Sequence, residues 1–174
     1  HPLLQQGLSI LDTPGLNALG SEPELTMNML PAAQAILFLL AADTGVTRSD
    51  LDIWQQHVSR AKHKNTKGTA VILNKVDTLW DDLKSEKEVQ FSISEQVRKT
   101  ASMLGINKEL IFPVSAQKGL LAKINGDDSL FARSQLQQLE DYIAQEVLPT
   151  REAILRESIV EGLGSVLDEH RTSF

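Results

Sequence analysis

The sequence predicts an α/β fold in which a parallel β-sheet lies between two layers of helices. Four short apolar runs are continuous rather than alternating, which is typical of strands covered on both faces. Between and after them, apolar residues recur every three or four positions, which is the period of an amphipathic helix. Because a crossover helix returns the chain to the same edge of a sheet, this alternation favours parallel strands.

The predicted strands come first because they fix the order of the sheet. They are Leu8–Asp12, Ala35–Ala42, Ala70–Leu73 and Leu110–Val114. The first one ends on a charge, Asp12, and Thr-Pro-Gly follows at once, a turn sequence that cannot extend a strand. A carboxylate at the end of a buried strand points to a functional role for that position.

Three helices are predicted between and after the strands, over residues 48–62, 82–104 and 134–147. Thr47 and Asp50 form a capping-box pattern before the first, and Gly105 is a plausible stop after the second. The inward residues are Leu51, Trp54, Val58 and Ala61 in the first helix; Val89, Ile93, Val97, Ala101 and Leu104 in the second; and Leu136, Leu139, Ile143 and Val147 in the third. Residues 125–129 are predicted to form a polar surface loop.

Composition narrows the functional class. The 174 residues carry a net charge of −6 with no basic stripe, which disfavours nucleic-acid binding as the main activity. Cysteine is absent, so disulfides and thiolate metal sites are excluded, which fits a reducing cytoplasm. The longest apolar run, Ala35–Ala42, is much shorter than the roughly 20 residues of a membrane-spanning helix.

Polar or turn residues follow every predicted strand. These segments are Asp12–Gly15, Asp43–Gly45, Asn74–Asp77 and Ser115–Gly119. In open α/β sheets ligands bind beyond the carboxyl ends of the strands, so we expect one site there.

The residue types in these segments suit a nucleotide. Asp12 could hold Mg²⁺ through water, and the Gly15 backbone N–H is open to a phosphate. Asp77 offers two carboxylate oxygens to the two neighbouring N–H donors of guanine, while the Lys75 stem could lie along the base. The backbone N–H of Ala116 could donate to the guanine carbonyl.

Three of these segments resemble the third, fourth and fifth motifs of Ras-type GTPases, in that order. They are Asp12-Thr-Pro-Gly15, Asn74-Lys-Val-Asp77 and Ser115-Ala116; Asn74 lies 62 positions after Asp12, and Ser115 lies 38 positions after Asp77. The long segment 16–29, the stretch 41–50 and the helix leaving after Leu148 look most like a bacterial dynamin-like protein. The resemblance implies a P-loop GTPase (G domain) fold of three layers, with GTP or GDP and Mg²⁺ as cofactors.

One part of the GTPase pattern is missing. No Gly-x-x-x-x-Gly-Lys-Ser/Thr loop, the main phosphate-binding element, occurs in the chain. Since the chain begins with His1, we expect an N-terminally truncated G domain over residues 1–148 and the start of a helical bundle or stalk over 149–174. No catalytic residue can be named, because the P-loop and the first switch are absent from the sequence. In addition, the apolar Leu16 stands near the place where Ras-like proteins carry a water-orienting Gln. The parent protein is expected to hydrolyse GTP and this chain alone is not.

The resemblance assigns a role to each motif residue. It implies Asp12 on Mg²⁺ and Gly15 on the γ-phosphate, with Ser115 bracing the loop. Asn74, Lys75, Asp77 and Ala116 are assigned to guanine.

A nucleotide-dependent switch over residues 13–30 would drive homodimer formation, self-assembly through the G domain or partner binding. We expect the protein to be cytoplasmic. Peripheral binding to a membrane surface is a further alternative for the dynamin-like interpretation. The alternatives are an Era-type ribosome- or RNA-associated GTPase, disfavoured by the five acidic and three basic residues of 151–172, and a G-fold scaffold that does not hydrolyse nucleotide.

Several other residues have simpler interpretations. Asp43 and Asp50 are interpreted as turn and cap residues, and the four histidines as surface or packing residues. Trp54 is assigned to the core. Trp80 either covers the base or packs at the surface, and packing is the preferred interpretation.

Overall fold

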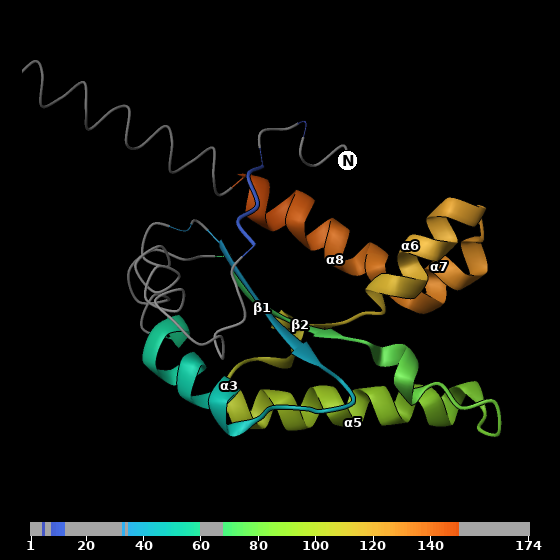
Figure 1. Cartoon of the computed structure of the whole chain (residues 1–174), viewed down its shortest axis with the longest axis horizontal. Coiled ribbons are helices and arrows are strands. Elements are labelled where there is room, and N and C mark those ends of the chain that lie inside the picture. Colours follow the sequence, from blue (N-terminus) through green and yellow to red (C-terminus); the bar gives the residue numbers. More distant parts are fainter. Residues whose placement is uncertain (1–4, 6–7, 13–32, 34, 60–67, 150–174) are drawn as a thin grey trace, which may run out of the picture.

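A three-stranded parallel sheet is the centre of the molecule. The computed structural model describes residues 5, 8–12, 33, 35–59 and 68–149. Strands β1 (Ala35–Ala41), β2 (Gly68–Asn74) and β3 (Ile111–Pro113) pair in the order β1-β2-β3. Figure 1 shows helices on both sides of this sheet. The predicted α/β class with a parallel sheet is therefore confirmed.

Strand β2 occupies the middle of the sheet. Its residues Gly68–Asn74 pair one to one with Ala35–Ala41 of β1, and Val71–Leu73 pair with Ile111–Pro113 of β3. All residues of β2 except Asn74 are buried, as its continuous apolar run predicts.

One helical layer covers the sheet with α3 (Arg48–Ile53), the π-helical turn η2 (Trp54–Val58) and α5 (Glu86–Leu104). The first and second predicted helices correspond to these elements, and residues 60–67 lie outside the described part. Trp54 is buried in the core as predicted, and its Nε1 donates to the Leu104 carbonyl at 2.9 Å. The core of this layer consists of Ile36, Phe38, Leu40, Ala42, Trp54, Val58, Val71, Leu73, Val76, Val89, Ile93, Leu104 and Ile111.

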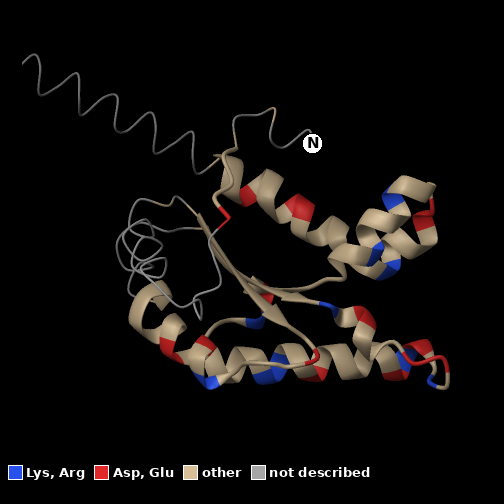
Figure 2. Ribbon diagram, viewed as in Figure 1, with Lys and Arg blue, Asp and Glu red and all other residues tan. Residues whose placement is uncertain are grey.

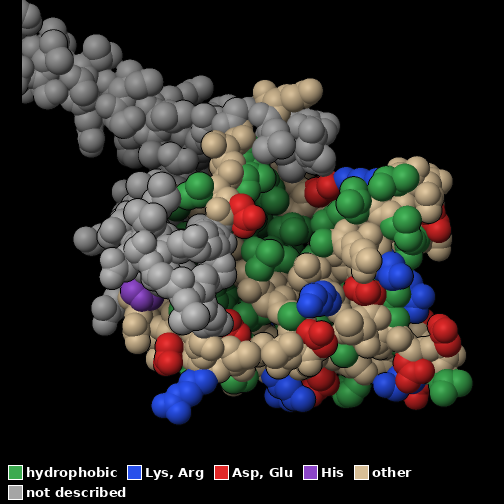
Figure 3. Space-filling view, viewed as in Figure 1, with side chains coloured by type: hydrophobic (Ala, Val, Ile, Leu, Met, Phe, Trp, Pro, Cys, Tyr) green, Lys and Arg blue, Asp and Glu red, His purple; other side chains and the backbone are tan. Residues whose placement is uncertain are grey.

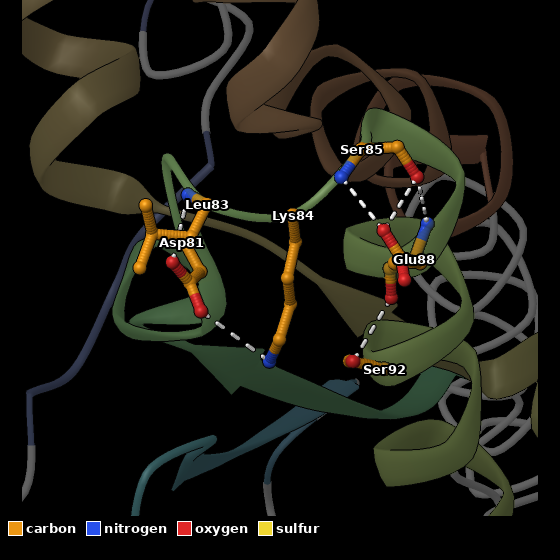
Figure 4. Close-up of polar contacts among 6 residues, drawn as sticks. All are labelled: Asp81, Leu83, Lys84, Ser85, Glu88 and Ser92. Carbon is orange, nitrogen blue, oxygen red and sulfur yellow. Dashed lines mark hydrogen bonds and ion pairs between the residues drawn. The ribbon is translucent and has the colours of Figure 1, made fainter.

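Local sequence signals fix the ends of these helices. Thr47 and Asp50 form the predicted capping box before α3, and Gly105 ends α5 in the left-handed conformation at φ 65°. Helix α5 begins at Glu86 rather than 82, because a second capping box between Ser85 and Glu88 sets its start (Figure 4).

The opposite layer contains four short helical elements. They are α6 (Ala116–Asn125), α7 (Asp128–Ser134), α8 (Leu136–Tyr142) and the π-helical turn η5 (Ile143–Val147). The predicted helix 134–147 corresponds to α8 and η5, and the rings of Phe112 and Tyr142, 4.7 Å apart, pack β3 against it. Burial raises the pKa of the Tyr142 hydroxyl, and the charge of Glu146 adds to the effect.

Helices α6 and α7 were not predicted from the sequence. The expected loop 125–129 is shorter than predicted, because the Asp127 side chain accepts from the Leu130 N–H at 2.9 Å and starts α7. Both helices are too short to show a strong apolar period. The polar, turn-forming residues 125–129 between and at their ends therefore favoured a loop in the sequence interpretation.

The first predicted strand is wrong in the described residues. Residues 8–12 form no strand, and Ile10 and Leu11 are 69% and 60% exposed. A strand exists only where a neighbouring strand takes up its backbone groups, and the described ladders join β1, β2 and β3 alone.

Strand β1 is buried on one face only, although its sequence predicts two. Ile36, Phe38 and Leu40 face the core, whereas Leu37 and Leu39 are 36% and 64% exposed. Figure 3 shows hydrophobic side chains open to view at the centre of the molecule. Burial therefore alternates along β1 because no described element packs on its second face, and not because that face is polar.

No helix in the described part of the chain is long and apolar enough to cross a membrane. Charges of both signs are interspersed along α5 rather than gathered into a basic stripe (Figure 2). Residues 150–174, which hold nearly all of the predicted bundle segment, lie outside the described residues.

Candidate functional site

The ends of β2 and β3 are joined into one junction beyond the sheet. The Val114 N–H donates to the Leu73 carbonyl at 3.0 Å, and the Val76 N–H donates to the Val114 carbonyl at 3.2 Å. The end of β1 is attached to the same place, since the Ala42 N–H donates to the Asn74 carbonyl at 2.8 Å. Parallel pairing thus continues past the strands and fixes the loops that follow them.

Asn74 is the polar centre of this junction. Its Oδ1 accepts the Lys75 N–H at 2.8 Å and the Ala116 N–H at 3.1 Å. One side-chain oxygen therefore ties the loop after β2 to the loop after β3. The sequence assigns Ala116 N–H to a guanine carbonyl, but in this structure it donates to Asn74.

The turn after Asn74 has an unusual backbone. Lys75 is in the left-handed region at φ 65°, a conformation that costs a non-glycine residue on the order of 1–3 kcal/mol. The Thr78 N–H and Oγ1 both donate to the Lys75 carbonyl, at 3.0 and 2.7 Å, and hold the turn closed. The short helix η3 (Val76–Leu79) follows and carries Asp77. Strain of this kind gathers at functional sites, which makes this turn a candidate.

Asp77 and Ser115 form the second link between the loops. The Ser115 Oγ donates to Asp77 Oδ1 at 2.6 Å, and it also accepts the Lys118 N–H at 3.3 Å to cap α6. Ser115 is fully buried, so this hydroxyl is held in one position. Asp77 Oδ2 has no hydrogen bond to any residue that the structure describes.

The structure thus brings together four of the predicted site residues, Asn74, Asp77, Ser115 and Ala116, with the exposed Lys75 beside them. It does not bring Asp12 to them. The segment 8–12 lies away from the carboxyl ends of β2 and β3 in Figure 1, and Asp12 is exposed. Gly15 lies outside the described residues. The expectation that all four segments meet at one edge is wrong for residues 8–12.

The simpler interpretations of neighbouring residues also have outcomes. Asp50 is a cap residue, as predicted, and Asp43 lies in the exposed turn after β1. Trp80 packs against a side chain, since the Arg133 guanidinium lies 4.3 Å from its ring centroid. His57 lies in η2, and no group of three or more His, Asp or Glu side chains in the described residues could hold a metal ion.

Comparisons with known proteins identify the family of the chain. The sequence profile described as "Dynamin family" matches residues 1–76. An Arabidopsis thaliana protein described as "Probable transmembrane GTPase FZO-like, chloroplastic" is 32% identical over 137 residues, which is 78% of this chain. The chain belongs to the dynamin family. It spans 14% of the length of that dynamin-family relative.

Two solved structures overlap more loosely with this dynamin-family chain. A single-residue variant of Aquifex aeolicus Era bound to GDP·AlF4⁻ is 23% identical with a TM-score of 0.49, over 79% of this chain and 39% of that one. Era in complex with MgGDPNP and nucleotides of 16S ribosomal RNA is 27% identical with a TM-score of 0.43, over 67% of this chain and 37% of that one. Both TM-scores are below 0.5, so the architecture of the dynamin-family chain rests on its own sheet and helices.

The described residues do not by themselves form a magnesium site. Asp12, the one carboxylate assigned to the ion, is exposed, and the segment 8–12 lies away from the carboxyl ends of β2 and β3 (Figure 1). Mg²⁺ favours octahedral oxygen coordination, which one isolated carboxylate does not supply.

Some features of this dynamin-family site were missed by the sequence interpretation. Nothing in the sequence signals the left-handed Lys75, because lysine has no preference for that region. The contact of Arg133 with Trp80 was missed because α7 itself was not predicted. Asp127, a good helix N-cap after Gly126, was the signal that could have found α7.

Proposed function

We propose that this chain supplies the guanine-recognising part of a GTP-binding and GTP-hydrolysing domain in a dynamin-family protein. The single observation that carries the proposal is the junction in which Asn74 and Asp77 hold Ala116 and Ser115 across two loops. Family membership supports it independently.

Asp77 is the residue that selects the base. Its Oδ2 accepts one neighbouring N–H of guanine, while Oδ1 keeps its bond from Ser115 and accepts the second N–H with a remaining lone pair. Adenine does not present two adjacent donors on that edge, so the pair discriminates against it. The exposed Lys75 stem lies along the base with its ammonium in water.

Nucleotide binding redistributes one hydrogen bond of the junction. The Ala116 N–H turns from Asn74 Oδ1 to the guanine carbonyl, and Asn74 retains the Lys75 N–H. Since β3 and the α6 cap hold the Ser115 loop on either side, we expect the Ala116 N–H to turn without a larger rearrangement of that loop.

The phosphate end is proposed from the motif alone. Asp12 would hold Mg²⁺ through water, the Gly15 N–H would contact the γ-phosphate, and residues 13–30 would act as a switch that governs homodimer formation or partner binding. Since no Gly-x-x-x-x-Gly-Lys-Ser/Thr loop is present, the 174-residue chain alone has no measurable GTPase activity, and hydrolysis belongs to the longer protein. Location at a membrane surface is part of the same proposal for the parent protein.

Competition binding tests this function. Fluorescent GDP is titrated against the 174-residue chain and against the full-length natural protein, with GTP or ATP as competitor. We expect the full-length protein to bind GDP, GTP to compete and ATP to fail. Failure of both proteins to bind guanine nucleotide would leave the three motifs as relics on a scaffold and overturn the proposal.

A further inference from the structure

Two adjacent residues at the end of α7, Arg133 and Ser134, contact both loops of the proposed base site. Neither belongs to a GTPase motif. They come from the helix that follows α6, and the turn after them leads directly into α8. Their contacts are with the Ser115 loop on one side and with the turn that carries Asp77 on the other.

Ser134 holds the loop after β3. Its backbone carbonyl accepts the Ser115 N–H at 2.9 Å. Its own hydroxyl donates to the Phe131 carbonyl at 2.6 Å and accepts the Leu136 N–H at 3.3 Å, and the residue is fully buried. Gly119 allows α6 to approach this turn, since a Cβ there would lie 3.0 Å from Ser134 Oγ. These contacts therefore fix the Ser134 carbonyl in the position where it accepts the Ser115 N–H.

Arg133 holds the turn after β2. Its guanidinium lies 4.3 Å from the centroid of the Trp80 ring, and its Nη2 is 3.4 Å from Glu86 Oε2 at the start of α5. The backbone N–H of Trp80 donates to the Asp77 carbonyl at 3.1 Å and closes η3. Arg133 thus fixes the residue that ends the turn on which Asp77 stands.

We propose that Arg133 and Ser134 are positioning residues for base selectivity, which act by holding the Asp77 turn and the Ser115 loop at a fixed separation. The inference rests on the proposed guanine site. The direct bond from Ser115 to Asp77, at 2.6 Å, leaves little tolerance in that separation. A shift of either loop moves Asp77 away from the edge of the base, where the 2-amino group of guanine is read.

A positioning role of this kind affects the discrimination between GDP and IDP more than the overall affinity for nucleotide. Inosine diphosphate (IDP) keeps the ring N–H of guanine and lacks the 2-amino group. If the Asp77 turn moves, GDP loses the bond to that amino group and IDP has none to lose. The ratio of the dissociation constants for IDP and GDP is therefore a readout that a loss of stability alone does not move.

The test uses the full-length protein with Arg133→Gln and a matched control, Arg98→Gln. Arg98 also forms an ion pair, with Glu95 at 2.8 Å, but at an exposed position of α5. We expect Arg133→Gln to lower the IDP-to-GDP ratio of dissociation constants by about three- to tenfold, the scale of one cation–π contact. Arg98→Gln should leave the ratio unchanged.

A second pair of variants tests the ring contact without removing the charge. Trp80→Phe keeps an aromatic face for Arg133 and should retain most of the selectivity, whereas Trp80→Leu should lose it to the same extent as Arg133→Gln. These two substitutions leave Arg133 and its ion pair to Glu86 in place, so they remain informative if Arg133→Gln does not fold.

Asp77→Asn, measured in parallel, separates the two levels of the argument. If Asp77→Asn changes the base preference while the Arg133 and Trp80 variants weaken GDP and IDP equally, or not at all, the positioning role is overturned and the guanine site stands. If Asp77→Asn leaves the base preference unchanged, the proposed function itself fails and the positioning role fails with it. A lowered ratio in Arg133→Gln and Trp80→Leu, with the Phe variant and Arg98→Gln near wild type, supports the inference.

Discussion

The two sides of the sheet differ in how completely they are built. On the β2–β3 side the central strand is buried on both faces, and the loops beyond it are joined by side-chain and backbone hydrogen bonds. On the β1 side one face carries exposed Leu37 and Leu39, and residues 8–12 lie outside the sheet with Ile10 and Leu11 exposed. The described residues therefore complete the base end of the proposed site and leave the phosphate end unassembled.

This difference shows that a site residue is held in place only where the strand before it is paired and packed by neighbouring elements. Asn74 and Ser115 are held because β2 is buried on both faces and β3 pairs with it, so the chain leaves the sheet in a fixed direction. Asp12 follows an apolar run of similar composition, yet no described strand takes up its backbone. The same type of sequence gives an ordered site residue or an exposed one according to its neighbours.

The largest expected effect is on stability, from removal of a side chain on the central strand. Leu73 of β2 is fully buried, so Leu73→Ala should lower the free energy of unfolding of the chain by about 2–5 kcal/mol. Leu39→Ala, the same change on the exposed face of β1, should alter it by no more than about 0.5 kcal/mol. Urea unfolding of the two variants measures both. Equal losses would show that β1 is covered in solution and would break the comparison.

The sequence predicted the covered side better than the open side. The run Ala70–Leu73 predicts a buried strand, and the structure has one there. A continuous aliphatic segment suits the middle of a sheet, where both faces of the strand are covered. For residues 8–12 and for Leu37 the same inference was wrong, because periodicity reports what a segment can bury and not whether a neighbour is there to bury it.

The candidate site shows the same limit. The identities of Asn74, Asp77 and Ser115 followed from short motifs, and their proximity followed from parallel topology. The donor–acceptor pattern did not follow, because the Asn74 bond to Ala116 and the left-handed Lys75 depend on the final path of two loops. The contacts of Arg133 with Trp80 arise from a helix that local propensity did not reveal.

The next effect is on specificity and lies wholly on the covered side. Asp77→Asn in the full-length protein should weaken GDP by about 10- to 100-fold, the scale of a hydrogen bond to a charged group, and shift preference toward xanthine nucleotides. The reason is that an amide both donates and accepts, whereas the guanine edge offers donors alone. Competition of fluorescent GDP by GDP and xanthosine diphosphate measures the shift.

A matched control for that experiment is Asp81→Asn, in the loop that follows η3. Asp81 accepts from the Leu83 N–H at 2.9 Å and lies 3.6 Å from Lys84 Nζ at the surface (Figure 4). Its neutralisation should leave nucleotide preference as it is. A shift of equal size in both variants would point to net charge rather than to the Asp77 carboxylate.

The smallest effect concerns the start of α5, next to the covered side. The Glu88 carboxylate accepts the Ser85 N–H at 2.8 Å in the capping box drawn in Figure 4, and this backbone bond, with the Ser85 hydroxyl, lowers the Glu88 pKa from its ordinary value of 4.5. A carboxyl whose folded pKa lies below its unfolded pKa stabilises the fold above the unfolded pKa. That stabilisation is lost as the pH falls through the folded pKa.

Glu88→Gln removes this pH-dependent part and leaves the shape of the side chain. We expect wild type to be slightly more stable than the variant at neutral pH and the difference to shrink as the pH falls below about 4.5, the ordinary pKa of the group. Glu109→Gln is the control, since Glu109 is exposed and has no hydrogen bond or ion pair to any described residue. Urea unfolding from about pH 7 to about pH 3 measures both. A pH-independent difference for Glu88→Gln would mean that the neutral side chain caps α5 as well as the carboxylate does.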